Sequence, residues 1–265
     1  MVIPDFLQGH RTKKRRYYIY SQTWPHGRSN ILKLLFMSWS DLPGILCFVS
    51  LFLPVGVILY NRFYFHRSLA ALLVYYSNNI FYSLFSLGII PATTEFKAGL
   101  GTLNNFLDVP LMLTSLLFFC PSKQKQRIVK AFIAGFITYE LIIIFSNGTG
   151  TDSIVFILGP GMILVLTYAV YLFVRQVKFS IMHGKNQGRM FMLASILFAY
   201  ACYTLIYYFF YIDRTPYIAD TMLIYYIASF VASTLMAIGL HLMRKRMKEL
   251  ESVRLTRKEL AMFFS

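Results

Sequence analysis

The chain has 265 residues, of which 57% are hydrophobic and only 14% charged, and it carries a formal net charge of +15. Soluble globular domains are about one-quarter charged, so this composition excludes a soluble domain and predicts an integral membrane protein. The apolar runs are continuous rather than alternating, which excludes a transmembrane β-barrel and predicts an all-α fold.

The first 40 residues form a basic N-terminal extension without a membrane span. They carry seven Lys and Arg residues, including RTKKRR at 11–16. The apolar residues 31–39 are too few to cross a bilayer, which requires about 20 residues. Two interpretations stay open: a basic amphipathic segment that lies on a membrane surface, or an extension that precedes a functional start at Met37.

Seven apolar runs separated by short polar breaks occupy residues 41–243. Each is close to the length of about 20 apolar residues with which a helix crosses a bilayer core. The runs are 42–60, 69–90, 104–120, 128–146, 153–174, 190–211 and 220–243. We therefore expect one polytopic domain of seven transmembrane helices over 41–243.

The distribution of basic residues predicts which loops face the cytoplasm. Seventeen Lys and Arg residues fall in the first, third and fifth breaks and in the C-terminal tail, whereas the opposite loops hold only Lys97 and Arg214. Because Lys and Arg collect in cytoplasmic loops, we expect a cytoplasmic C-terminus and, after seven crossings, an N-terminus outside. The basic N-terminal extension conflicts with that side of the membrane, since such tails resist translocation.

Two acidic residues fall inside predicted spans, at a similar depth. The third span runs inward and places Asp108 about one turn below the outer surface, and the fourth runs outward and places Glu140 roughly 18 Å up, in the outer half. A charge near the centre of a membrane helix costs at least about 2.5 to 3.5 kcal/mol, so such a group normally faces the protein interior. No basic residue shares the depth of Glu140, so we expect a hydrogen-bonded or neutral acid there.

Other polar residues fall in the same half of the bundle. Four tyrosines of the sixth span recur at spacings of three, four and four, which aligns them on one helical face: Tyr200, Tyr203, Tyr207 and Tyr211. We expect a polar ligand-binding pocket formed by Asn78, Asn79, Tyr82, Asp108, Glu140, Tyr203, Tyr207 and Tyr225. The alternative is structural, because tyrosine stripes also pack membrane helices and a single Glu can tie two helices together.

Helix breakers add a weaker indication of a cavity. GPG at 159–161 lies in the fifth span, Pro110 lies two residues after Asp108, and Pro54 lies in the first span. A proline frees a backbone carbonyl in the preceding turn, and the freed group needs a new partner inside a membrane.

The sequence contains no catalytic or metal-binding signature. The five histidines lie in tails, loops or at a helix end, and there is no H-E-x-x-H helix, G-x-S-x-G elbow or phosphate-binding glycine loop. We therefore expect no enzyme activity, no metal and no cofactor. Nucleic acid is not an expected partner either, because cytoplasmic loops and tails that meet anionic lipid headgroups explain the basic excess.

The tail over 244–265 is predicted to continue the last span inward as a basic cytoplasmic helix. Its apolar residues approximate a narrow stripe, broken around Thr256 and Arg257. Such a helix would pair with a second copy of the chain, contact a cytoplasmic protein or lie on the membrane.

Seven helices, an outside N-terminus, a long outer loop over 91–103 and short loops elsewhere resemble the microbial rhodopsins. The stretch NNFLDVPLMLTSLLFF, residues 104–119, is similar to the acid-bearing, proline-containing third helix of that family. The resemblance implies a place near the counter-ion for Asp108 or Asn104. That family binds retinal through a lysine in its seventh helix, and residues 220–243 contain none, so no covalent retinal is expected.

These features favour a receptor-like or sensory protein of the plasma membrane or the bacterial inner membrane. A small or lipophilic ligand, or a proton, would enter the outer-half pocket, and the signal would leave through the C-terminal helix. The main alternative is a small-solute or proton-coupled transporter, and a membrane lipid enzyme is a third. A transporter needs access from both faces, whereas the intramembrane polar groups gather toward one.

Overall fold

The computed structural model describes residues 42–120, 122–148, 151–183, 187–213 and 218–263. The predicted N-terminal extension, residues 1–40, lies outside these ranges. The described ranges contain seven long helices and no strand, which confirms the predicted all-α class.

The long helices follow one another along the chain with short connections. They are α2 (Leu42–Tyr60), α3 (Arg67–Ser86), α4 (Thr94–Leu116), α5 (Lys123–Asn147), α6 (Thr151–His183), α7 (Gln187–Tyr207) and α8 (Ile218–Phe263). Short 3-10 turns, η1 (Phe63–Phe65) and η2 (Leu117–Phe119), follow α2 and α4, and a π-helical turn, η3 (Tyr208–Ile212), continues α7.

Six of these helices are long and apolar enough to cross a membrane, as judged from the described residues: α2, α4, α5, α6, α7 and α8. The helix α3 occupies the second predicted run but is less apolar, because it carries Asn78, Asn79 and several tyrosines and serines. Its 20 residues correspond to roughly 30 Å, the thickness of a bilayer core.

The predicted boundary between the second and third runs is wrong. α4 begins at Thr94, and the Thr93 side chain caps it by accepting a hydrogen bond from the Phe96 amide at 3.3 Å. The long outer loop expected over 91–103 is therefore mostly helix. The apolar run does not reveal this start because the first turns of α4 are polar, and a capping threonine rather than hydropathy marks where they begin.

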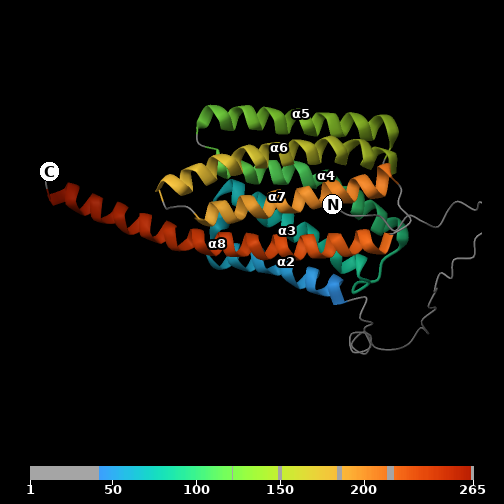
Figure 1. The fold of residues 1–265 in the computed structure, drawn as a ribbon, viewed down its shortest axis with the longest axis horizontal. Coiled ribbons are helices and arrows are strands. Elements are labelled where there is room, and N and C mark those ends of the chain that lie inside the picture. Colours follow the sequence, from blue (N-terminus) through green and yellow to red (C-terminus); the bar gives the residue numbers. More distant parts are fainter. Residues whose placement is uncertain (1–41, 121, 149–150, 184–186, 214–217, 264–265) are drawn as a thin grey trace, which may run out of the picture.

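Six helices form a closed ring, and the remaining one packs outside it. The neighbouring pairs around the ring are α2–α3, α3–α4, α4–α6, α6–α7, α7–α8 and α8–α2. α5 contacts α4 and α6 and forms the upper edge of the bundle in Figure 1. α8 extends past the bundle as a single continuous helix (Figure 1).

The peripheral helix α5 buries only three of its 25 residues, Val129, Phe136 and Glu140. The spacings of seven and four residues place all three on one narrow stripe. The opposite face carries exposed apolar side chains such as Phe132 and Phe145. A carboxylate therefore occupies one of the few positions at which protein covers this helix completely.

Large apolar side chains are exposed on the outside of every long helix. Examples, one from each helix in chain order, are Phe52, Phe81, Leu103, Phe132, Ile163, Leu205 and Phe230. Soluble monomers rarely expose contiguous apolar patches larger than a few hundred Å². The exterior therefore suits contact with lipid rather than with water.

Basic side chains lie over aromatic rings at one end of the bundle. Arg244 lies over the Tyr60 ring and Arg189 over the Phe118 ring, each 4.9 Å from the ring centroid. Lys125 donates a hydrogen bond to the Tyr171 hydroxyl at 2.6 Å. Aromatic and basic residues together are typical of a membrane–water interface.

The helices α7 and α8 make a direct backbone contact near this basic end. A Cβ atom at Gly188 would lie 2.6 Å from the Gly239 carbonyl oxygen, and a Cβ atom at Gly239 would lie 2.8 Å from the Gly188 carbonyl oxygen. Farther along, the Ser195 hydroxyl donates a hydrogen bond to the Ala232 carbonyl at 2.6 Å. Small residues at such a contact let membrane helices approach closely enough for backbone packing and hydrogen bonds to hold them together.

We expect Gly239→Ala to destabilise the bundle by about 1–3 kcal/mol, because the added methyl group has no room against the α7 backbone. The matched control is Gly135→Ala in α5, where a Cβ atom meets nothing within 4 Å. The control should be neutral or slightly stabilising, since alanine favours helix more than glycine does. Thermal unfolding of both variants in one detergent checks this, and equal midpoints would contradict the close contact.

Candidate functional site

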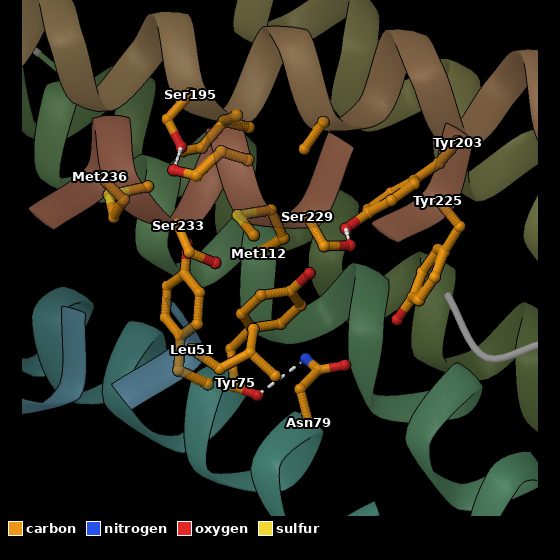
Figure 2. Close-up of a pocket in the computed structure, with 14 residues that line it drawn as sticks. Leu51, Tyr75, Asn79, Met112, Ser195, Tyr203, Tyr225, Ser229, Ser233 and Met236 are labelled. Atoms are coloured by element: carbon orange, nitrogen blue, oxygen red, sulfur yellow. Dashed lines mark hydrogen bonds between the residues drawn. The ribbon is translucent and has the colours of Figure 1, made fainter. Parts of the chain in front are cut away.

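A cavity with polar walls lies within the ring, between α2, α3, α4, α7 and α8 (Figure 2). Its polar lining comes from α3, α7 and α8 and consists of Tyr75, Tyr76, Asn79, Ser195, Tyr203, Tyr225, Ser229 and Ser233. Leu51, Met112 and Met236 contribute apolar surface. Among the described residues that line it, none carries a charge.

Helical spacing explains why these side chains meet. Ser195 and Tyr203 lie two turns apart on one face of α7, and Tyr225, Ser229 and Ser233 follow one another at four-residue intervals on α8. The Tyr203 and Ser229 hydroxyls hydrogen-bond at 2.9 Å and join the two helices. Figure 2 shows this bond on one wall, with Asn79 on the α3 side.

The cavity leaves about 20 Å³ for the centres of water molecules. About 10–15 Å³ of such space is enough for one water. The cavity therefore has room for a water molecule, with hydroxyl groups on three helices to hold it. A larger ligand requires the walls formed by α3, α7 and α8 to separate.

The two intramembrane acids are buried together outside this cavity. Asp108 is 2% exposed and Glu140 is 0% exposed, and they lie close enough to interact electrostatically. Among the described residues, neither carboxylate oxygen of Glu140 has a hydrogen-bond partner. The buried residues of the described ranges include no Lys or Arg. Each charge in such a place would cost several kcal/mol, and repulsion between the two would add to that.

A tyrosine of α7 connects the acid pair with the cavity. The Tyr200 hydroxyl, fully buried, donates a hydrogen bond to Asp108 Oδ2 at 3.0 Å. The Tyr200 ring lies 5.8 Å from the ring of Tyr203, which lines the cavity. The tyrosine stripe predicted from the sequence therefore links the two buried polar sites.

The eight residues predicted for one pocket fall into three groups. Asn79, Tyr203 and Tyr225 line the cavity, and Asp108 and Glu140 form the acid pair. The other three lie elsewhere: Asn78 donates to the Asn104 side chain at 2.6 Å, Tyr207 donates to the Val155 carbonyl at 3.0 Å, and Tyr82 is half-buried. A binding role for any of the eight stays a prediction.

Most of the cavity lining was not predicted from the sequence. The serines Ser195, Ser229 and Ser233 were missed because single serines are common in membrane helices and cost little there. Tyr225, Ser229 and Ser233 recur at four-residue intervals, and this spacing was the sequence signal for a polar face on the last helix. Tyr75 and Tyr76, directly before the predicted asparagines, gave a second one.

Proline in α6 explains one of the tyrosine contacts, and a second tyrosine binds the neighbouring carbonyl. Pro160 has no amide hydrogen, so the carbonyl of Phe156 loses its helical donor. The Tyr139 hydroxyl of α5 donates to that carbonyl at 2.8 Å, and Tyr207 of α7 donates to the neighbouring carbonyl of Val155 at 3.0 Å. The side chains thereby satisfy backbone groups that lipid cannot.

The glycines beside Pro160 allow neighbouring helices to approach. A Cβ atom at Gly159 would lie 2.7 Å from the Tyr207 hydroxyl, and one at Gly161 would lie 2.6 Å from Val109 and 2.8 Å from Phe136. Val109 follows Asp108 in the sequence, and Phe136 lies one turn before Glu140. The tight packing of α6 is therefore next to the acid pair, which explains how water is kept from it.

Comparison of the chain with protein-family models, with curated proteins and with solved structures finds no match. The resemblance to microbial rhodopsins is therefore still a prediction. The function has to be inferred from the cavity, the acid pair and the helices that carry them.

We expect Tyr139→Phe to destabilise the protein by about 0.6 kcal/mol and at most about 1.7, the range for hydrogen bonds between membrane helices. Pro160→Ala restores an amide donor for the Phe156 carbonyl, so the same tyrosine change should have no effect in that background. A double-mutant cycle of unfolding free energies measures the difference. Tyr208→Phe, at an exposed tyrosine, is the control, and equal losses in both backgrounds would refute the pairing.

Proposed function

We propose that this protein is a receptor-like membrane sensor, in which a small uncharged lipophilic ligand with hydrogen-bonding groups enters the hydroxyl-lined cavity. Hydroxyl and amide side chains there offer donors and acceptors, and Leu51, Met112 and Met236 offer apolar contact. A pocket of this composition suits a mostly apolar ligand that is oriented by a few polar groups. Asn79, Tyr203 and Tyr225, predicted from the sequence, would contact it.

The observation that carries the proposal is that α8 both lines the cavity and extends beyond the bundle. Tyr225, Ser229, Ser233 and Met236 of this helix line the cavity. The same helix continues without interruption past its apolar span, which ends at Arg244, to Phe263. A ligand that separates α8 from α3 would therefore displace a helix that reaches roughly 30 Å beyond the bundle.

The proposal includes a topology. α3 would be the seventh crossing, shielded from lipid on the side that lines the cavity and long enough for a bilayer core. The end of the bundle at which Arg189, Arg244 and Lys125 lie over aromatic rings would be cytoplasmic. The extension of α8 would then contact a cytoplasmic protein or a second copy of the chain, in the plasma membrane or the bacterial inner membrane.

Transport is the less favoured function. A transporter opens its site to each face in turn. On the basic side of the cavity the α7 and α8 backbones meet at Gly188 and Gly239. Below Met236 the fully buried Leu240 also occupies this contact region. This packing supports a site that is closed toward one face.

We expect Ala199→Val to reduce ligand binding, because Ala199 is a lining residue and the added methyl groups fill the small cavity. Ala201→Val, two residues along α7 and outside the lining, is the matched control. The assay is native mass spectrometry of small molecules that remain bound to protein extracted from its own membranes. A lipophilic molecule retained by the wild type and the control, and lost from Ala199→Val, supports the proposal.

Two results would contradict it. Equal retention by both variants would place the bound molecule elsewhere. Proton or solute flux through the wild-type protein in liposomes, abolished by Ala199→Val, would make the cavity part of a transport path and replace the sensory function.

A further inference from the structure

We propose that Asp108 and Glu140 together form a proton-binding site, separate from the ligand cavity, that holds the peripheral helix α5 against α4 and α6. The site goes beyond the proposed sensory function and does not depend on it. Its occupant would be a single proton on Glu140, favoured by the nearby charge of Asp108, and its release would loosen α5.

Burial and missing partners point to a positively charged occupant. Glu140 is 0% exposed, and both of its carboxylate oxygens lack a hydrogen-bond donor. Asp108, 2% exposed, interacts electrostatically with Glu140 from the facing helix. Two negative charges in a dry helix junction would repel each other, and the buried described residues include no Lys or Arg to offset them. A proton on the pair removes one charge and supplies the missing hydrogen-bond donor.

The side chains around the pair can stabilise the remaining negative charge but cannot neutralise both acids. Tyr200 of α7 donates to Asp108 Oδ2, and Tyr75 of α3 is within electrostatic range of the same carboxylate. Tyr139, the neighbour of Glu140 in the sequence, and Tyr207 of α7 use their hydroxyls on α6 carbonyls. From α6, Gly161 faces Val109 and Phe136 beside the pair and presents no titratable group there.

A second buried polar atom without a partner among the described residues lies on the same helix as Asp108. Asn104 lies one turn before Asp108 on α4, is 1% exposed, and has an amide nitrogen without a hydrogen-bond acceptor. Its amide oxygen is already used by Asn78 of α3. The described residues contain no group of three or more His, Cys, Asp or Glu side chains that would hold a metal ion. A proton, which needs only two oxygens, therefore fits better than a metal cation.

The position of Glu140 gives the proton a mechanical effect. Glu140 is one of only three buried residues of α5, with Val129 and Phe136, so its charge acts within the narrow stripe at which α5 packs against the bundle. With the proton bound, Glu140 is uncharged and α5 stays docked. With the proton lost, the two carboxylates repel, and α5 moves away from α4. Because Tyr200 connects Asp108 with the cavity side of α7, this movement would also alter the cavity.

The direct test is infrared spectroscopy of the full-length protein in lipid nanodiscs. The wild type at neutral pH should show the carbonyl stretch of a protonated carboxylic acid, and raising the pH should remove it. Glu140→Gln should abolish this band, because it removes the carboxyl group that holds the proton. The matched control is Glu95→Gln, which removes an exposed carboxylate at the start of α4 and should leave the band unchanged.

Measurements of thermal stability give a second readout, and they can still be interpreted if one of the variants folds poorly. The thermal midpoint of the wild type and of Glu95→Gln should fall as pH rises through the range where the band disappears. Glu140→Gln should keep the midpoint that the wild type has at acidic pH and show no such fall. Asp108→Asn should weaken the fall without abolishing it, because the repulsion is gone but Glu140 still ionises in a buried place.

Three results would overturn the proposal. One is a wild-type protein without a protonated carboxyl band at neutral pH. Another is a band that persists in Glu140→Gln. The third is a band that sodium ions remove while raising the thermal midpoint, with potassium or choline as the comparison, because the pair would then bind a metal cation. None of these outcomes measures ligand binding in the cavity. A failure of the proton-site proposal would therefore not contradict the sensory proposal, which the Ala199→Val experiment tests.

Discussion

The structure depends on one constraint: inside a lipid-facing bundle, each polar group has to find its partner within the protein. The contacts of α6 show how the chain meets this requirement. Pro160 removes a backbone donor, and tyrosines from α5 and α7 supply two hydroxyls to the carbonyls of the preceding turn. The same requirement makes Glu140 exceptional, because it is equally buried and has no donor.

Close approach of backbones is the second element of the architecture, and it determines where space remains. Gly188 and Gly239 bring α7 and α8 into contact near the basic end, and Gly161 brings α6 against Val109 and Phe136. Between these contacts, serines and tyrosines are short or rigid enough to leave a small cavity. The helix α3 is less apolar than the six candidate spans, and its polar residues Tyr75, Tyr76 and Asn79 line this cavity.

The arrangement also separates two kinds of chemistry that the sequence placed in one pocket. The cavity is lined by neutral hydroxyl and amide groups, suited to orienting an uncharged ligand. The acid pair lies where α5 packs against the ring, and we propose that it holds a proton. Tyr200 donates a hydrogen bond to Asp108, and its ring meets the ring of the cavity-lining Tyr203 edge to face. A change at either place can therefore affect the other.

The sequence by itself determined the all-helical class, the approximate positions of seven helices and the isolation of Glu140, because continuous hydrophobicity and the cost of an intramembrane charge act locally along the chain. It misplaced the start of α4, where a threonine cap and not hydropathy sets the boundary. Only the tertiary structure decided that α5 lies outside the ring, that Asn79 and Tyr225 share a cavity from which Glu140 is absent, and that Tyr139 serves Phe156. These facts follow from which helices pack together. The sequence of one helix does not show which helix it will contact, as the packing of Gly188 against Gly239 illustrates.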